Sequence, residues 1–345
     1  MAKPLRYSDA GVDLSVWNKT KVRIGELVSS TYNSSVVGKF GQFGGMFDTS
    51  SFVSMKHPVL VSSTDSVGTK VMVAFESGIH DSVGQDIVNH CIDDILVLGA
   101  RPLFFLDYIG IHKLVPEVAE QIVTGLSIAC KAAGCVLIGG ETAEMPDLYK
   151  KGEYDLVGCI VGVVDKEKII DGSTIVPGDV LIGLRSNGLH TNGYSLARKI
   201  VKEVAGKSYS DIFEPTGKSF AQELLRPHRA YTPVLKLMDQ GLIKGCAHLT
   251  GGGFQDNIDR ILPQNCNAVI LTNAWTPDPI FSWLQEAGNV EKEEMYHTFN
   301  MGIGLVLAVK PEVADTIMSS KEIESFEPVV IGSINEGAGK VVLEF

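Results

Sequence analysis

The chain has 345 residues, of which 45% are hydrophobic and 21% are charged, and its formal net charge at pH 7 is −11. This length favours two domains of a globular enzyme, and the acidic balance argues against a nucleic-acid binder, which needs a basic face. No apolar run approaches the roughly 20 residues of a membrane span, and the first residues lack the apolar segment of a signal peptide.

The N-terminal region predicts a short helix near residues 19–29, followed by a glycine-rich loop. The loop GKFGQFGGMF (38–47) carries four glycines and three phenylalanines. Such a loop can fold over phosphates and exclude water. A hairpin turn anchored by the phenylalanines is the alternative.

Residues 59–70, VLVSSTDSVGTK, combine a short apolar strand with an acid, a glycine turn and a lysine. The run 59–61 suits a buried strand. Past its end, Asp65 can hold Mg²⁺, Gly68 lets backbone N–H groups approach anionic oxygens, and Lys70 supplies a charge to phosphate. This order suits a nucleotide-phosphate site, although it is not the GxxxxGK[ST] loop. A polar turn with a surface ion pair is the alternative.

The stretch 81–102 predicts a helix in which Ile87, Cys91 and Leu98 form an apolar stripe. Asp94 falls in this stripe. A carboxylate there is costly unless it is paired or bound to a metal, so Asp94 is the candidate metal ligand. An aspartate at the rim of the stripe, satisfied by a backbone N–H group, is the alternative.

The neighbouring Asp93 lies on a different side of the same predicted helix. It shares a stripe with Asp86 and His90, which we interpret as the more polar side. Asp93 is therefore expected to neighbour the metal ligand without being one.

The rest of the N-terminal half predicts strands at 102–110 and 154–165 and a helix at 116–133. Between them, CVLIGGETAEMP (135–146) repeats the order of the opening stretch, with a short strand followed by glycines and acids. Because open α/β sheets bind ligands where their strands end, these acids are expected to gather at one site.

Turn residues accumulate at 165–179, which places a domain boundary after residue 168. A strand at 180–184 precedes SNGLHTNGYSLARK (186–199), a turn that holds His190 and opens a helix at Asn192. Such a helix start suits an anion, and a capped loop with a structural histidine is the alternative. The loop HLTGGGF (248–254) is a second possible phosphate cradle. Residues 224–240 are predicted to be mostly helical, with breaks at Pro227 and Pro233. Further strands are predicted at 267–271, 302–309, 329–333 and 341–344.

The cysteines form no C-x-x-C pair, which favours buried, reduced thiols and a cytoplasmic location. They are Cys91, Cys130, Cys135, Cys159, Cys246 and Cys266.

Eight stretches of the chain occur in the order and spacing of one enzyme family. They are DAGVD (9–13), TDSVGTK (64–70), GQDIVNHCIDDILVLGARPLFFLDY (84–108), GGETAEMP (139–146), GEYDLVG (152–158), SNGLHTNGYSLARK (186–199), HLTGGGF (248–254) and MYHTFNMGIG (295–304). Over nearly its whole length the chain resembles phosphoribosylformylglycinamidine cyclo-ligase, also called aminoimidazole ribonucleotide synthetase.

The resemblance implies a two-domain α/β (α+β) fold, with an ATP-binding and dimerisation domain at 1–168 and a C-terminal α/β sandwich at 169–345. The N-terminal mixed sheets of two subunits join into a barrel, and ATP binds in a cleft shared across the homodimer. The implied reaction is ATP-dependent ring closure of formylglycinamidine ribonucleotide to aminoimidazole ribonucleotide, with ADP and phosphate as products, in purine biosynthesis. A sibling small-molecule kinase of the same superfamily is the alternative, and an ATP-binding regulatory subunit is a third.

The inventory of acids, glycines and cations suits phosphorylation of an amide oxygen, because that chemistry needs positioning and charge neutralisation. The implied cofactors are ATP and Mg²⁺. The expected metal ligands are Asp65, Asp94 and Glu141. The expected ATP-binding residues are Gly44, Gly45, Asp65, Gly68, Thr69, Lys70, Gly139, Gly140, Glu141 and Thr142. The expected substrate-binding residues are His190, Asn192, Gly251, Gly252 and Gly253. The expected catalytic residues are Lys70, Asp94 and His190.

Lys39 and Gln42 of the glycine-rich loop depart from the family's usual pattern, and so do two further positions. Ser66 stands where glycine is common in relatives, and Asp93 stands where asparagine is common. The second change adds a carboxylate beside the expected metal site.

Overall fold

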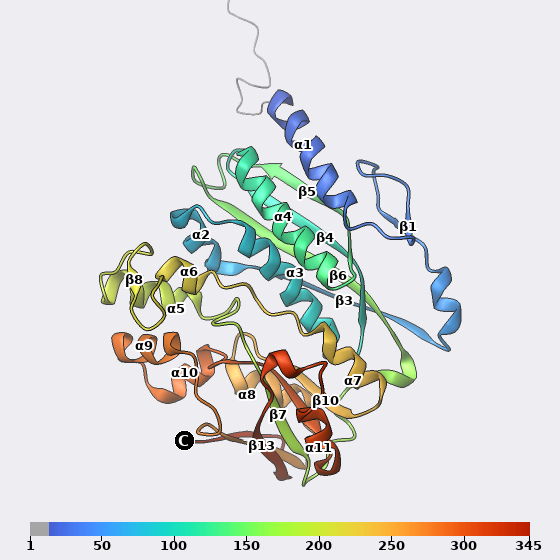
Figure 1. The fold of residues 1–345 in the computed structure, drawn as a ribbon, viewed down its shortest axis with the longest axis vertical. Helices are drawn as coiled ribbons and strands as arrows, with labels where there is room; N and C mark the ends of the chain where they lie inside the picture. Colours follow the sequence, from blue (N-terminus) through green and yellow to red (C-terminus); the bar gives the residue numbers. More distant parts are fainter. Residues whose placement is uncertain (1–13) are drawn as a thin grey trace, which may run out of the picture.

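The computed structural model describes residues 14–345, so the motif at 9–13 lies outside the described part of the chain. Two main sheets, one of four strands and one of six, organise the molecule. The four-stranded sheet comes from the N-terminal half and the six-stranded sheet from the C-terminal half (Figure 1). The predicted boundary after residue 168 lies in the connection between them.

The N-terminal sheet has the strand order β3-β6-β4-β5. Its strands are β3 (Pro58–Ser66), β6 (Tyr154–Asp165), β4 (Arg101–Ile111) and β5 (Val136–Glu144). Strand β6 pairs antiparallel with both β3 and β4, whereas β4 and β5 run parallel. Strand β6 has the predicted bounds, but β3 and β5 continue through the polar segments that were expected to follow them. Asp65 and Glu141 therefore lie within strands.

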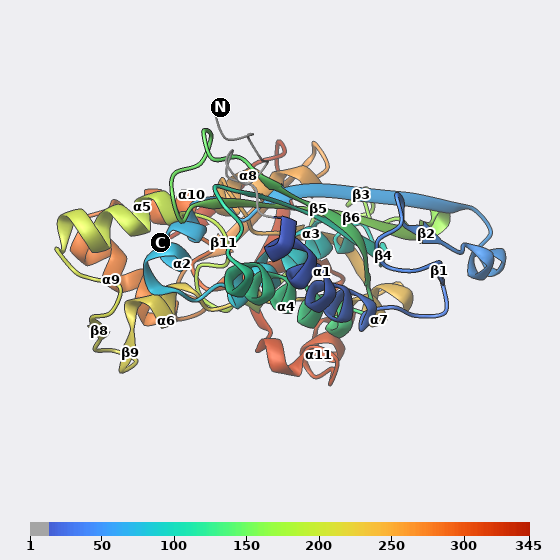
Figure 2. The ribbon, with the colours of Figure 1, turned by 90° about the horizontal axis from the view of Figure 1, so that it is seen from above.

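Three helices cover one face of this sheet (Figures 1 and 2). They are α1 (Leu14–Ser29), α3 (Asp81–Leu96) and α4 (Pro116–Ala132). The interface between these helices and the sheet is apolar. Ile87 of α3, Phe105 of β4 and Ile160 of β6 are all fully buried there in one core. Helix α3 ends at Leu96, so Leu98 lies beyond the stripe in which it was placed.

The opposite face of the N-terminal sheet is only partly covered by the described residues. Strand pairing places Leu60, Ser62 and Thr64 of β3 on the same face as Val163, Val161 and Cys159 of β6. On this face Leu60 is 63% exposed. The same face carries Phe104, Leu106 and Tyr108 of β4. We call this surface, made by β3, β6 and β4, the open sheet face.

The C-terminal sheet has the order β10-β12-β7-β13-β11-β14. Its strands are β10 (Ile243–His248), β12 (Ile303–Val309), β7 (Val180–Arg185), β13 (Val329–Glu336), β11 (Cys266–Leu271) and β14 (Val341–Glu344). Every residue of β12 is buried, which explains its continuous apolar sequence. The sequence pattern did not reveal β10.

Further helices and four short strands complete the described part of the chain. They are α2 (Val71–Ser77), α5 (Tyr194–Lys199), α6 (Phe220–Leu224), α7 (Leu235–Asp239), α8 (Gly253–Ile258), α9 (Pro279–Gly288), α10 (Lys292–Thr298) and α11 (Pro311–Met318), with the short strands β1 (Val36–Val37), β2 (Met46–Phe47), β8 (Ile212–Phe213) and β9 (Lys218–Ser219). Within the stretch 224–240, residues 225–231 form an irregular segment that includes the expected break at Pro227. Residues 232–239 beyond it are helical, and Pro233 does not break them. Among the described residues, no helix is long and apolar enough to cross a membrane.

Candidate functional site

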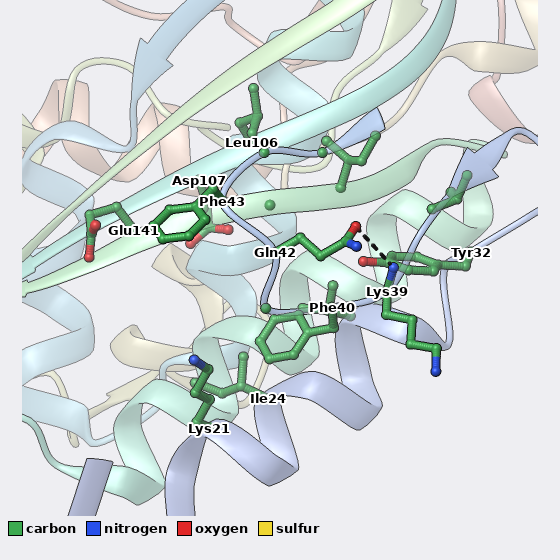
Figure 3. A pocket seen from close by; sticks show the side chains of 18 of the residues that line it. Lys21, Ile24, Tyr32, Lys39, Phe40, Gln42, Phe43, Leu106, Asp107 and Glu141 are labelled. Atoms are coloured by element: carbon green, nitrogen blue, oxygen red, sulfur yellow. Dashed lines mark hydrogen bonds between the residues drawn. The ribbon is translucent and has the colours of Figure 1, made fainter. Parts of the chain in front are cut away.

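The structure divides the predicted site residues between two hollows on the molecule. The first, which we call the loop pocket, has a volume of about 590 Å³ and lies between α1, the glycine-rich loop and the β5 edge of the sheet. Its lining includes Gly44, Gly45, Gly139, Gly140, Glu141 and Thr142. Figure 3 shows Lys21 and Ile24 of α1, Phe40 and Phe43 of the loop, and Asp107 and Glu141 of the sheet around it.

Two glycines of the loop pocket are required by close contacts. A Cβ atom on Gly45 would lie 2.7 Å from Ile138, and one on Gly140 would lie 2.3 Å from the Asp107 carboxylate. Burial raises the pKa of the Asp107 carboxyl to about 7. In the loop, the backbone N–H of Lys39 donates to Gln42 Oε1 over 3.3 Å (Figure 3). Glycine at positions 45 and 140 therefore lets the loop pack closely against β5, and β5 against β4.

The second hollow, which we call the interdomain cleft, has a volume of about 720 Å³. It lies between the β3 edge of the N-terminal sheet and the segment around β10 and α8. Asp65, Asp94, Asn192 and Gly251 line it, as expected for ligand-binding residues, and so does Arg260, which the sequence did not single out.

Asp65 and Asp94 are close enough to influence each other's ionisation. Burial first, and then hydrogen bonding and repulsion with Asp94, raise the pKa of Asp65 to about 7. Burial opposes ionisation of Asp94, but the hydrogen bond from His248 lowers its pKa below the usual value overall. Asp94 also accepts a hydrogen bond from Ser63 Oγ at 3.0 Å. Two adjacent carboxylates of this kind fit a divalent cation, which would offset their repulsion.

Glu141 does not join this pair within one chain. Strands β3 and β5 are the two edges of the four-stranded sheet, so three strand spacings, or about 14 Å, separate them. The Glu141 side chain is exposed, and it accepts a hydrogen bond from the backbone N–H of Thr142. Within one chain the three expected metal ligands Asp65, Asp94 and Glu141 therefore do not lie together.

Lys70 does not face either hollow. Its ammonium is fully buried and donates hydrogen bonds to Asp86 Oδ1 at 2.9 Å and to the backbone carbonyls of His190 and Arg226 at 2.9 and 2.8 Å. An ammonium has three donors, and all three are used. This geometry contradicts the predicted phosphate contact and makes Lys70 a buried link between the two halves of the chain. Gly68 and Thr69, just before it, are exposed.

His190 is also buried rather than exposed to a ligand. Its Nε2 accepts a hydrogen bond from the backbone N–H of Asn187 at 3.0 Å, and its ring stacks on His228 with 3.9 Å between centroids. Burial, followed by nearby positive groups, lowers the pKa of His190 well below its usual value. The structure thus contradicts direct substrate binding by His190 and agrees with the alternative of a structural histidine.

The triple-glycine loop contributes to the cleft through its first glycine only. Gly252 and Gly253 both have positive φ, at 88° and 60°, and a Cβ atom on Gly253 would lie 1.9 Å from the Tyr296 carbonyl oxygen. These two glycines permit the tight turn into α8, rather than lining the cleft.

The side of α3 that was expected to be more polar is buried as completely as the apolar stripe. Asp86 and Asp93 have no exposed surface, and His90 is 6% exposed. The segment around His228 and Tyr231 covers them, and its backbone N–H groups donate to Asp86 at 2.6 Å and to Asp93 at 3.0 Å. Sequence periodicity missed this because the covering segment is distant in the chain and irregular.

Two family models match the chain in succession. The model described as AIR synthase related protein, N-terminal domain, matches residues 48–164, and that described as AIR synthase related protein, C-terminal domain, matches residues 176–344. A protein of Geobacillus thermodenitrificans, named phosphoribosylformylglycinamidine cyclo-ligase, is 48% identical, with 96% of each chain covered. One of Trichlorobacter lovleyi with the same name is 50% identical, with 92% of each chain covered.

The chain belongs to the phosphoribosylformylglycinamidine cyclo-ligase family. Solved structures with the same fold include thiamine-monophosphate kinase from Stenotrophomonas maltophilia, with a TM-score of 0.67, 15% identity and 96% of each chain covered. HypE from E. coli also has a TM-score of 0.67, with 18% identity and 95% of this chain and 93% of that chain covered. At these identities the likeness concerns the fold, and the cyclo-ligase family rests on the sequence matches.

Proposed function

We propose that the protein catalyses the ATP-dependent ring closure of formylglycinamidine ribonucleotide to aminoimidazole ribonucleotide in purine biosynthesis. The γ-phosphoryl group of ATP moves to the formyl amide oxygen, and ADP leaves. The ring-closing nitrogen then attacks the activated carbon, and the carbon–oxygen bond breaks with release of phosphate and a proton. The 48% identity over 96% of both chains to a cyclo-ligase carries this proposal.

The residues of the interdomain cleft suit this chemistry. Asp65 and Asp94 would hold a divalent cation, which when bound neutralises phosphate charge. Arg260 supplies a guanidinium that can pair with the substrate phosphate, and Asn192 and Gly251 offer polar groups beside it. In the loop pocket, the glycine-rich loop and the Gly139–Gly140 pair leave room for ATP against the backbone. The chain's part in the reaction is therefore to orient two reactants and exclude water.

A turnover assay tests the proposed reaction. Purified protein with Mg²⁺ and ATP should release phosphate only when formylglycinamidine ribonucleotide is added, because the phosphoryl acceptor completes the site. Thiamine monophosphate serves as the control for the sibling kinase activity, whose fold the chain shares. Equal phosphate release with thiamine monophosphate, or none with the named substrate, would overturn the proposal.

We further propose that two chains form a homodimer through the open sheet face. Support comes from the apolar residues on this face, including Leu60 at 63% exposure and the half-buried Phe104, Leu106 and Val161. A contiguous apolar surface of this kind marks a contact site. A dimer can also bring Glu141 of one chain beside the cleft acids of the other. One chain alone cannot do this, because Glu141 lies about 14 Å from Asp65 across the sheet. The proposed ATP site combines the loop pocket of one protomer with the cleft acids of its partner.

Mixing two inactive variants tests the shared site. Asp94→Asn removes a cleft acid, Glu141→Gln removes a loop-pocket acid, and each homodimer should be inactive. After unfolding and refolding together, half of the dimers are mixed, and in each of these one of the two sites is intact. The mixture should regain about a quarter of the wild-type activity, because phosphate charge is neutralised only at intact sites. No recovery, with mixed dimers confirmed by mass spectrometry, would place both acids in one chain.

The six cysteines, all free in the structure, support a reducing compartment, and we propose the cytoplasm. Cys91, Cys130, Cys135, Cys246 and Cys266 are buried. Alkylation of the protein purified without reductant should therefore detect six thiols after unfolding. Fewer thiols would point to disulfides and to an oxidising compartment.

A further inference from the structure

Two histidines reach the same part of the interdomain cleft as Asp65 and Asp94. His90 Nε2 lies 3.5 Å from Asp65 Oδ2 and 3.8 Å from Asp94 Oδ2. His248 Nδ1 lies 2.9 Å from Asp94 Oδ1. Both histidines line the cleft although their side chains are only 7% and 3% exposed. The four side chains come from β3, α3 and β10, so they converge only in the folded chain.

The spacing of these atoms is that of ligands around one ion. The donor atoms of His90, Asp94 and His248 all lie within 4.8 Å of one another. A tetrahedral ion with bonds of about 2.0–2.1 Å holds neighbouring ligand atoms about 3.3–3.4 Å apart. The separations of 2.9, 3.5 and 3.8 Å fall on both sides of this value. Small side-chain adjustments would therefore bring the donors of His90, Asp94 and His248 onto one ion, with the Asp65 carboxylate close enough to join them.

The second nitrogen of each histidine ring is held by the protein. His90 Nδ1 lies 2.7 Å from Thr191 Oγ1, and His248 Nε2 lies 3.0 Å from His228 Nε2. Metal-binding histidines are oriented in this way, because a hydrogen bond at one ring nitrogen fixes the other as the ligand. The contact at one nitrogen of each ring thus fixes the orientation of the other nitrogen, which faces the cleft. An ion at the site would replace the proton that His248 shares with Asp94.

We propose that Asp65, Asp94, His90 and His248 form a centre that takes a divalent transition-metal ion such as Zn²⁺ or Co²⁺ in preference to Mg²⁺. This deepens the proposed function, because Asp65 and Asp94 are its metal-binding carboxylates. Mg²⁺ prefers oxygen ligands in near-ideal octahedral geometry, whereas imidazole nitrogen suits transition metals. The two nitrogen donors therefore set which ion the cleft binds.

Metal titration of the full-length protein, stripped with a chelator and free of ATP and substrate, tests this proposal. Co²⁺ should bind at one ion per chain, with visible absorption typical of mixed nitrogen and oxygen ligands. Calorimetry should show weaker binding of Mg²⁺, and a large excess of Mg²⁺ should not displace Co²⁺. This competition uses the wild-type protein, so it does not depend on a variant folding.

Variants then assign the site to these residues. His90→Leu removes one nitrogen ligand and should weaken Co²⁺ binding by at least about 10-fold, since even the loss of an outer partner has this effect. His297→Ala, a change at an exposed histidine of α10, should leave Co²⁺ binding unchanged. Equal affinities for Co²⁺ and Mg²⁺, or full Co²⁺ binding by His90→Leu, would overturn the proposal. Turnover with Mg²⁺ but no Co²⁺ binding would refute only the metal preference, whereas Co²⁺ binding without turnover would refute only the proposed reaction.

Discussion

Lys70 and Asp86 form a fully buried ion pair that joins the two halves of the chain. Lys70 Nζ lies 2.8 Å from Asp86 Oδ2, and both side chains have no exposed surface. Burial raises the pKa of Asp86 to about 6, although Lys70 acts to lower it. Desolvation of such a pair offsets much of its attraction, but removing one partner leaves an uncompensated buried charge. The pair therefore matters to stability chiefly when it is broken.

We expect Lys70→Met to lower the free energy of unfolding by roughly 3–5 kcal/mol. Without Lys70 the pKa of Asp86 rises further, and a folded-state pKa above the unfolded one costs stability as the pH rises through it. The loss should therefore be larger at pH 8 than at pH 5, as measured by urea unfolding at both values. The exposed Lys207→Met is the control. A loss no larger than that of the control would contradict the structural role.

At the scale of elements, helices α3 and α4 cross with their backbones in contact. A Cβ atom on Gly125 would lie 1.9 Å from the Asp81 carbonyl oxygen, and one on Gly84 would lie 2.1 Å from the Ile122 carbonyl oxygen. Only glycine permits this approach, because the atoms in contact belong to backbone that cannot rotate away. The close crossing keeps α3 in place, and with it Asp94 and His90.

Gly125→Ala should therefore destabilise the protein by roughly 1–3 kcal/mol or more, even though alanine is the better helix former by about 1 kcal/mol. Thermal unfolding followed by circular dichroism measures the change. The matched control is Gly44→Ala, because a Cβ atom there meets nothing within 4 Å. A melting temperature for Gly125→Ala equal to that of the control would contradict this prediction, because it would mean that α3 and α4 can move apart without a loss of stability.

At the scale of the whole molecule, the N-terminal sheet carries helices on one face and the open sheet face on the other. Val161 lies near the middle of the open sheet face, on the inner strand β6, opposite Ser62 of β3 and Phe104 of β4. Its side chain is half-buried in the single chain. A charge at this position would stay hydrated in a monomer but would be desolvated in a dimer.

Val161→Asp should accordingly convert the proposed dimer to a monomer at micromolar concentration. Light scattering on the eluted peak measures the mass, and circular dichroism shows whether the chain remains folded. Val204→Asp changes a valine that is 56% exposed and lies away from this face, so it should keep the wild-type mass. A wild-type monomer, or a Val161→Asp dimer, would contradict assembly through the open sheet face.

The sequence by itself determined the family, most strands and the candidate acids, because these depend on local patterns. Strand β6 and helix α4 have apolar periodicity that their own residues supply, and Gly140 is required by its close contact with Asp107 of the neighbouring strand β4. It could not determine that the polar side of α3 is buried as well as the apolar side. Asp86 and Asp93 are covered by an irregular segment some 140 residues away in the chain. The backbone N–H groups of His228 and Tyr231 in this segment donate hydrogen bonds to the two carboxylates. Nor could the sequence show that Lys70 is buried between the two halves of the chain whereas Asp94 lines a cleft. Burial depends on what distant segments pack against a residue, and only the tertiary structure decides that.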